Sequence, residues 1–345
     1  MERRGPQELC GKHFDVVIPT VGRPSLPVVV GALARTLPQA SRLIVVDDRP
    51  AGAAAPRLVE LPDDPRLVVL HSGGRGPAAA RNLGWRAADA AWVAFVDDDV
   101  DVPLGWVRHL EADLEAVGPD VGAVQGRIRV PLAPGRPPTD WERNVGGLEH
   151  ARWITADLAV RRDALAAVGG FDERFPRAYR EDADFALRLL DHGWRLERGR
   201  RLMRHPVRPA PWWVSVRLQR GNADDVLIEE LHGRGWRARL GVAPGAFAAH
   251  RVTVMSGLAA LVAGAARRRR LAALAGTWWL ARTARFAWRR IGPGPRDVRE
   301  VLAMTATSVL IPPTAVFHRL RGYLRRYATW LGSLSARPSV PRRGG

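Results

Sequence analysis

Four acidic residues stand close together near residue 100, directly after an apolar run. The segment reads WVAFVDDDVDV over residues 92–102, so that Asp97, Asp98 and Asp99 are consecutive and Asp101 follows. Two carboxylates held about 4 Å apart repel by roughly 4 kcal/mol at an effective dielectric near 20, and a bound dication reverses the sign of that interaction. Mg²⁺ or Mn²⁺ prefers oxygen ligands and often binds one or two protein carboxylates together with substrate phosphates. The run predicts such a cation and a diphosphate, while helix capping or a solvated turn is the structural alternative.

A second group of charged residues surrounds a glycine-rich segment. Asp47 and Asp48 end the apolar run RLIVVDD, and the segment GGRGPAAARN (73–82) carries Arg75 and Arg81. Guanidinium groups beside a helix N-terminus suit a diphosphate. The glycines also satisfy a G-x-G-x-x-A pattern, which is typical of dinucleotide binding, although it follows the third apparent strand instead of the first.

A third acidic group begins a helix in the segment EDADFALRLL. Glu181, Asp182 and Asp184 stand in its first turn, after the glycine-rich turn at 169–170. Acids in this position compensate the helix dipole, which is the structural alternative. Three acids exceed what capping needs, so the pattern also indicates acid–base chemistry.

The elements that must position these groups alternate between strands and helices. Apolar runs rich in β-branched residues predict buried strands at 14–19, 42–48, 66–70 and 91–99, and helical spacing predicts helices at 25–36 and 77–90. A further strand is expected at 154–160, a helix at 181–194 and a last strand within 194–206. Strand–helix alternation predicts an α/β sheet, and such sheets bind ligands at the carboxyl ends of their strands, where both Asp runs fall.

Five spaced motifs together resemble those of family 2 glycosyltransferases of the GT-A fold, a Rossmann-like mixed sheet flanked by helices. They are VVIPTVGRPSL, VVDD, GPAAARNLGWRAA, FVDDDV (the DxD motif), and ITADLAVRRDALAAVGGFDERF followed by EDADFALRL, in family order over about 14–206. The resemblance implies transfer of a sugar from a nucleotide sugar, with inversion at the anomeric carbon and a divalent cation, Mn²⁺ or Mg²⁺, as cofactor.

The resemblance also implies roles for individual residues. It gives Asp182 as the general base and Asp99 and His205 as metal ligands. Donor binding is expected from Pro19, Thr20, Arg23, Asp47, Asp48, Arg81, Asn82, Asp97 and Asp98. Asp157, Glu181 and Asp184 are expected on the acceptor side.

Three positions depart from the family pattern. Asp157 stands where Asn is common, Arg180 precedes the ED pair where Gly is frequent, and Phe185 replaces the usual Leu. These positions lie near the expected acceptor side, so they leave the acceptor, rather than the chemistry, undetermined.

The basic residues are concentrated at one end of the chain. Of the 345 residues, 53 are Lys or Arg and 35 are Asp or Glu, giving a net charge of +18, and residues 251–345 hold 18 Arg against two acids. The segment LAALAGTWWLARTARFAW (271–288) interleaves Arg with aromatic residues, which is typical of helices lying on an anionic membrane. An ordinary helical subdomain with a solvated Arg face is the structural alternative.

The domain organisation follows from this change in composition. We expect an N-terminal tail at 1–13, a GT-A domain at 14–250 with its nucleotide-sugar half at about 14–130 and its acceptor half at about 131–250, and a basic helical region at 251–345. The apolar segments 252–266 and 301–317 are short or interrupted by Pro312 and Pro313, so they are weak candidates for spanning helices. The lone Cys10 excludes an intrachain disulfide.

These observations predict a cytoplasmic enzyme, peripheral on the inner face of the cell membrane, whose acceptor is a glycan or a lipid-linked molecule. Arg with aromatic residues also describes a nucleic-acid binder, but the charge avoids the α/β domain and no nucleic-acid motif is present, so no nucleic-acid partner is expected. A nucleotidyltransferase would also use metal and diphosphate; a nicotinamide dehydrogenase would leave FVDDDV and EDADF unexplained.

Overall fold

The computed structural model describes residues 13–50, 52, 58 and 60–335. The predicted N-terminal tail, except for its last residue, and Cys10 lie outside this range. The chain forms two compact units. Of the described residues, unit 1 comprises those within 13–134, 142–209 and 237–242, and unit 2 comprises those within 135–141, 210–236 and 243–335. The division therefore falls at 210, with two short exchanged segments, whereas the composition suggested a boundary near 250.

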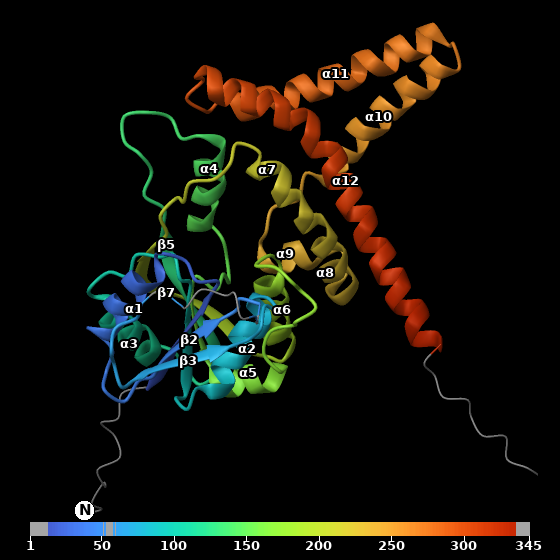
Figure 1. Ribbon diagram of the computed structural model, residues 1–345. Coiled ribbons are helices and arrows are strands. Elements are labelled where there is room, and N and C mark those ends of the chain that lie inside the picture. Colours follow the sequence, from blue (N-terminus) through green and yellow to red (C-terminus); the bar gives the residue numbers. More distant parts are fainter. Residues whose placement is uncertain (1–12, 51, 53–57, 59, 336–345) are drawn as a thin grey trace, which may run out of the picture. The chain divides into compact units, whose positions relative to one another are not determined.

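Unit 1 is built on one mixed sheet of seven strands (Figure 1). Its order is β3-β2-β1-β4-β6-β5-β7, in which β1, β2, β3 and β4 are mutually parallel and β6 is antiparallel to both neighbours. The strands are β1 Phe14–Thr20, β2 Leu43–Asp47, β3 Leu67–His71, β4 Trp92–Val96, β5 Val121–Arg129, β6 Asp157–Arg161 and β7 Arg195–Arg204. The sheet and its flanking helices confirm the predicted mixed α/β fold.

Strands β1, β2 and β4 are buried along their whole length, which explains why their sequences are continuous apolar runs. The helices of unit 1 are α1 Leu26–Ala34, α2 Pro77–Ala87, α3 Trp106–Ala116, α4 Asp140–Gly146, α5 Arg162–Val168, α6 Glu181–Asp191 and α9 Trp236–Leu240, of which α4 and α9 begin in unit 2. Helix α2 packs closely on the sheet at Gly84, where a Cβ atom would lie 2.3 Å from Val17 Cγ1.

Unit 2 is helical, as the sequence predicts for its C-terminal part. It contains α7 Val214–Arg217, α8 Asp224–His232, α10 Phe247–Ala265, α11 Arg269–Ile291 and α12 Val298–Ser335. Helices α10 and α11 form an antiparallel hairpin (Figure 1). Gly257 allows their close approach, because a Cβ atom there would lie 2.9 Å from the Trp279 ring, and Arg282 donates a hydrogen bond to Thr253 Oγ1 at 3.1 Å.

Helix α12 runs through Pro312 and Pro313 without ending. The prediction that these two prolines interrupt the helix is therefore wrong. Each proline removes one backbone donor, which costs a helix a hydrogen bond. Ile311 and Ala315 beside the pair are buried, so packing within unit 2 offsets that loss.

Within the part of the chain that the structure describes, two helices are long and apolar enough to cross a membrane on length and composition alone. They are Phe247–Ala265, with a mean hydropathy of 1.3, and Val298–Ala328, with 1.4.

Candidate active site

The carboxyl ends of three neighbouring parallel strands bring the predicted donor residues to one edge of the sheet. Strand β1 ends at Thr20, β2 at Asp47, and β4 at Val96, immediately before Asp97. Since β1 lies between β2 and β4, residues that are far apart in the sequence meet there. The pairing register places Thr20 opposite Asp47. The edge therefore collects both Asp runs around Thr20.

Asp98 is the most enclosed acid of the DDD run. It is fully buried, accepts a hydrogen bond from Thr20 Oγ1 at 2.5 Å and forms an ion pair with Arg23. Burial raises the pKa of Asp98, and the charge of Asp99 adds to the rise, while Arg23 and Thr20 oppose it. Asp98 therefore ties β1 to β4 and fixes the backbone from which Asp97 and Asp99 project.

Asp48 is oriented by the glycine-rich loop. Its carboxylate accepts hydrogen bonds from Ser72 Oγ at 2.6 Å and from the Gly76 amide at 3.0 Å. Gly76 has φ +101°, and a Cβ atom there would lie 3.0 Å from the Pro176 carbonyl oxygen, so only glycine fits this turn. Asp47 is held separately by the Arg49 guanidinium at 2.7 Å. The loop at 73–76, whose glycines match a dinucleotide-binding pattern, thus uses the Gly76 amide to position Asp48.

Three residues could hold a metal ion. Asp97, Asp99 and His205 each offer one ligand atom, and these atoms lie within 4.8 Å of one another. Two carboxylates and one imidazole form a donor set that suits a divalent cation such as Mn²⁺. The His205 Nε2 atom lies 3.7 Å from Asp99 Oδ1. The sequence placed Asp99 and His205 in the metal site; the structure adds Asp97.

A cavity of about 220 Å³ opens beside these acids. The residues around it are Pro19, Thr20, Val21, Arg23, Asp48, Pro77, Arg81, Asp97, Asp98, Asp99, Ala178, His205 and Arg208. Of the predicted donor and metal residues, Asp47 and Asn82 lie outside this lining.

Arg208 is a cavity residue that the sequence reasoning missed. Its guanidinium lies 2.6 Å from Asp99 Oδ2 and is about half exposed. The signal that could have found it is weak, because it is one Arg among many in the segment RHPVRPAP after the last strand. Its position beside the DDD run places a cation among the acids of the cavity.

Arg81 links the cavity to helix α6. It is buried, and its guanidinium lies 3.0 Å from Glu181 Oε1 and 3.4 Å from Asp97 Oδ1. Burial and the neighbouring Asp182 raise the pKa of Glu181 to about 8. Within the described residues, Glu181 Oε2 has no hydrogen-bond partner. Glu181, expected on the acceptor side, is thus a buried partner of a donor-side arginine.

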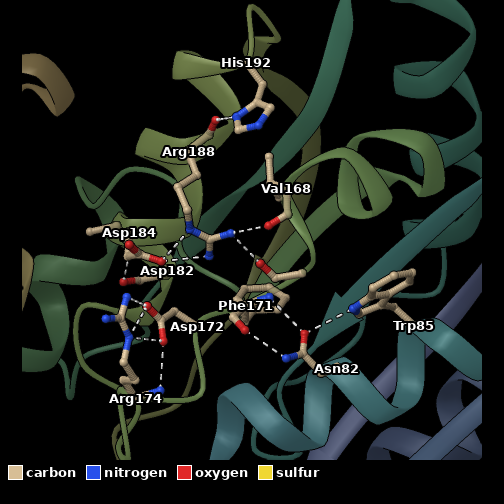
Figure 2. A network of polar contacts seen from close by, with 12 residues as sticks. Asn82, Trp85, Val168, Phe171, Asp172, Arg174, Asp182, Asp184, Arg188 and His192 are labelled. Atoms are coloured by element: carbon tan, nitrogen blue, oxygen red, sulfur yellow. Dashed lines mark hydrogen bonds and ion pairs between the residues drawn. The ribbon is translucent and has the colours of Figure 1, made fainter. Parts of the chain in front are cut away.

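Of the three acids in the first turn of α6, Asp182 is the only one with partial exposure. Asp184 is fully buried and paired with Arg188, which also donates to the Val168 and Gly170 carbonyls at 2.8 and 2.7 Å (Figure 2). Asp182 accepts from the Ala183 amide at 2.7 Å. Burial raises the pKa of Asp182, so the carboxyl holds a proton more tightly than an ordinary aspartate does.

Asn82 belongs to a clamp on the glycine turn that precedes α6. Its side chain bonds the Phe171 backbone on both sides, donating to the carbonyl and accepting from the amide at 2.8 Å each, and also accepts from Trp85 at 3.1 Å (Figure 2). Gly170 has φ +78°, and a Cβ atom there would lie 2.3 Å from Asn82 Oδ1. Asn82 is predicted to bind the donor. The structure shows it bonded to the backbone of the segment 169–171, which precedes α6 and Asp182 in the sequence.

Asp157 lies in the core on β6, away from the cavity. It is fully buried and bonded to Arg201 at 2.8 Å and to the Trp106 indole at 3.1 Å. Arg201 also pairs with Asp113 at 3.1 Å. The expected acceptor-side residue is thus part of a buried ion cluster that joins β6, β7 and α3.

Arg180 precedes α6 in a left-handed conformation with φ +77°. A non-glycine residue there is strained, which accounts for glycine in the family pattern. Its side chain lies over the Tyr179 ring at 4.2 Å.

Residues 15–168 match the model described as Glycosyl transferase family 2. The Pre-mycofactocin glycosyltransferase of Mycobacterium tuberculosis is 35% identical over 174 residues, which cover 45% of this chain and 35% of that protein. The Succinoglycan biosynthesis protein ExoO of Rhizobium meliloti is 32% identical over 111 residues, covering 31% of this chain and 32% of that protein. The chain thus matches about a third of the length of these curated relatives.

Among solved structures, the mannosyltransferase PcManGT from Pyrobaculum calidifontis, in complex with GDP-Man and Mn²⁺, aligns with a TM-score of 0.55 at 19% identity. The alignment covers 89% of this chain and 87% of that one, and at this identity it bears on the fold. The family match contains β1 to α5, including the DDD run and the loop that orients Asp48. The similarity to glycosyl transferase family 2 thus lies in the sheet domain, over residues 15–168.

Proposed function

We propose that this protein transfers a sugar from a nucleoside diphosphate sugar to an acceptor hydroxyl, with inversion at the anomeric carbon. The observation that carries the proposal is the cavity at the sheet edge, where Asp48, Arg81, the DDD run and His205 converge from separate segments. Carboxylates for a cation and guanidinium groups for phosphates in one cavity are what a metal-bound diphosphate needs.

Asp97, Asp99 and His205 would hold the divalent cation, Mn²⁺ or Mg²⁺. The cation would neutralise charge on the leaving nucleoside diphosphate. Arg23 and Arg208, which pair with Asp98 and Asp99, would contact the phosphates, and Asp48 would receive hydrogen bonds from the nucleoside.

Asp182 acts as the general base. An acceptor hydroxyl has a pKa far above neutrality, so its proton must leave as the oxygen attacks, and a carboxylate can accept it. Attack from the face opposite the diphosphate inverts the configuration. Asp182 is partly exposed while Glu181 and Asp184 are buried, and the Arg81 bridge connects its helix to Asp97.

Replacement of Asp182 by Asn tests this assignment. We expect Asp182→Asn to bind the nucleotide sugar as the wild type does and to transfer about 10²–10⁴-fold more slowly. Asp99→Asn is the matched variant, because it should instead lose metal-dependent donor binding. A panel of nucleotide sugars with Mn²⁺, assayed by calorimetry and by release of nucleoside diphosphate, measures both. Transfer by Asp182→Asn at the wild-type rate contradicts the base, and release of pyrophosphate instead of nucleoside diphosphate supports a nucleotidyltransferase.

We further propose that unit 2 lies on an anionic membrane surface on the cytoplasmic side and that the acceptor is lipid-linked or part of a cell-envelope glycan. The hairpin exposes apolar side chains along both helices. These are Val252, Met255, Leu258, Leu261, Val262, Leu271, Leu274, Trp278, Leu280 and Trp288. Only 11% of the apolar window in α10 is buried.

The arginines at the tip of the hairpin favour an interfacial position over a spanning one. Arg267–Arg270 connect the end of α10 to the start of α11. The 19 residues of α10 extend about 28 Å, close to the roughly 30 Å of a bilayer core, so a spanning hairpin would carry all four arginines across the membrane. Arginine-rich connections remain on the cytoplasmic side.

A further inference from the structure

Unit 2 contains a cavity of its own, of about 360 Å³. Its walls come from the segment 136–141, from 210–215 and from 295–304, all of which belong to unit 2. Trp212, Arg299 and Ala303 also line an adjoining apolar cavity of about 280 Å³ together with Leu302 and Ala306. The site residues assigned above do not include these segments.

A buried arginine holds the walls in place. Arg290 donates to Asp140 Oδ2 at 2.7 Å, to Thr307 Oγ1 at 2.8 Å, to Ser215 Oγ at 3.0 Å and to Ser308 Oγ at 3.1 Å. These partners come from all three segments or their helices. The cavity is therefore a defined feature of unit 2 and is fixed by a polar network.

Flat aromatic surface and groups of both charges line the cavity. Trp141 and Trp212 supply indole rings, and Trp212 is 52% exposed. Among the described residues Arg299 makes no hydrogen bond or ion pair, so its guanidinium has donors to offer. Arg299 is exposed in the first turn of α12.

The acids of the cavity are fixed by the backbone and keep acceptor capacity. Glu300 accepts from the Asp140 amide at 2.7 Å, and Asp297 caps α12 by accepting from the Glu300 amide at 2.9 Å. Each carboxylate has about four acceptor positions, so these bonds leave others available.

This lining discriminates between classes of ligand. A polyanion would be attracted by Arg136 and Arg299 but repelled by Asp297 and Glu300. A purely apolar ligand would remove water from these four charged side chains without replacing its hydrogen bonds. A sugar ring has apolar C–H faces that pack on indoles and hydroxyl groups that both donate and accept. Pockets that combine aromatic walls with a few fixed polar groups are typical ligand sites, and the volume is in the range of such pockets.

We propose that this cavity is a carbohydrate-binding subsite that accepts pyranose rings of a glycan chain, with Trp212 as the stacking surface and Arg299 as the principal donor. The identification of this glycan as the acceptor or product of the enzyme rests on the proposed function. The binding of a glycan to this cavity does not rest on it.

The test is calorimetric titration of the full-length protein, without nucleotide sugar or metal, with four neutral trisaccharides: maltotriose, cellotriose, mannotriose and N,N′,N″-triacetylchitotriose. We expect at least one to bind, and Trp212→Ala and Arg299→Ala each to weaken it by about tenfold or more. Trp213→Ala is the matched control, because Trp213 is the neighbouring exposed indole and lies outside both linings. Asp99→Asn should bind the trisaccharide as the wild type does.

Absence of binding by all four trisaccharides overturns the proposal, as does an equal effect of Trp212→Ala and Trp213→Ala. Binding of a short prenyl phosphate alone would assign the cavity to an anionic amphiphile and also overturn it. Loss of trisaccharide binding in Asp99→Asn would place the sugar at the donor cavity. None of these results depends on whether Asp182→Asn retains transfer, so failure of this proposal is distinguishable from failure of the proposed function.

Discussion

At the scale of residues, the acids of the site differ in role because they differ in environment. Asp98 is enclosed by Thr20 and Arg23, whereas Asp97 and Asp99 face His205. The repulsion expected within the run is thus offset residue by residue, by hydrogen bonds and guanidinium groups. Asp101 pairs through its backbone with Arg204 and lies outside the cavity lining.

The raised pKa of Glu181 predicts a pH effect on stability. An acid whose folded pKa, about 8, exceeds the ordinary Glu value contributes stability that is complete below its unfolded pKa and is lost as pH rises toward 8. Glu181→Gln removes this titration while keeping a partner for Arg81. We therefore expect the melting temperature of Glu181→Gln, relative to wild type, to be higher at pH 9 than at pH 6.

Melting curves of both proteins at the two pH values measure this difference, in which the contributions of groups distant from Glu181 cancel. Glu115→Gln is the control, since it removes one exposed glutamate carboxylate of α3 and leaves Glu181 in place. A difference between Glu181→Gln and wild type that is constant with pH would contradict an ionisable, buried Glu181.

At the scale of elements, helix α6, which carries the proposed base Asp182, is positioned by the glycine turn at 169–170. Asn82 from α2 and Arg188 from α6 both bond the backbone of the segment 168–171, so the turn connects two helices on one side of the sheet (Figure 2). Asn82, which the sequence predicted to bind the donor, thus supports the turn directly. Asp184, predicted on the acceptor side, supports it through Arg188.

Two adjacent glycines allow the contribution of this contact to be measured. Gly169 and Gly170 both have positive φ, +74° and +78°, but a Cβ atom at Gly169 meets nothing within 4 Å, whereas one at Gly170 lies 2.3 Å from Asn82 Oδ1. We expect Gly170→Ala to lower the free energy of unfolding by about 1–3 kcal/mol more than Gly169→Ala does, because overpacking adds to the backbone strain. Denaturant titration measures the free energy of unfolding of both variants. Equal losses of stability would show that Asn82 moves away from the added methyl group without cost.

At the scale of the whole molecule, charge and apolar surface occur together in unit 2. The exposed apolar side chains of the hairpin and the arginines at its tip are what an interfacial helix pair requires. The family match ends at residue 168, so this feature belongs to the part of the chain outside it.

Neutralising the hairpin tip tests the membrane proposal. Each Arg near an anionic surface contributes about 1 kcal/mol, so replacing Arg267–Arg270 by Gln should weaken binding by up to about 4 kcal/mol and reduce its dependence on salt. The measurement is cosedimentation with vesicles containing anionic lipid. A matched control replaces four exposed arginines of unit 1, Arg108, Arg127, Arg129 and Arg200, which lowers the net charge equally. Equal binding by both variants would show that net charge, and not the tip, attracts the protein.

The sequence by itself determined most of the sheet and the location of its chemistry. Long apolar runs predict β1, β2 and β4 because strands covered on both faces have no polar alternation, and acids directly after such runs must lie at the sheet edge. The run at 66–70 predicted β3 as a buried strand as well, but β3 lies at the edge of the sheet and none of its residues is buried, so that part of the prediction is wrong. The resemblance to family 2 glycosyltransferases followed from five motifs in family order, and residues 15–168 match that family's model. Strand β5 was missed, since VGAVQGRIR contains two glycines and two arginines and its character depends on its neighbours.

Only the tertiary structure decided which acids are exposed. Asp157, Glu181 and Asp184 have the same chemistry as Asp182, yet each is buried beside an arginine. Arg201 and Arg81 come from distant segments, whereas Arg188 lies four residues from Asp184 on α6 and also bonds the carbonyls of 168 and 170. Asp97, Asp99 and His205 meet because β4 and the end of β7 reach the same edge. Apart from the pair Asp184–Arg188, this burial and pairing depend on contacts between residues 44 to 108 positions apart, and no local pattern in the sequence carries that information.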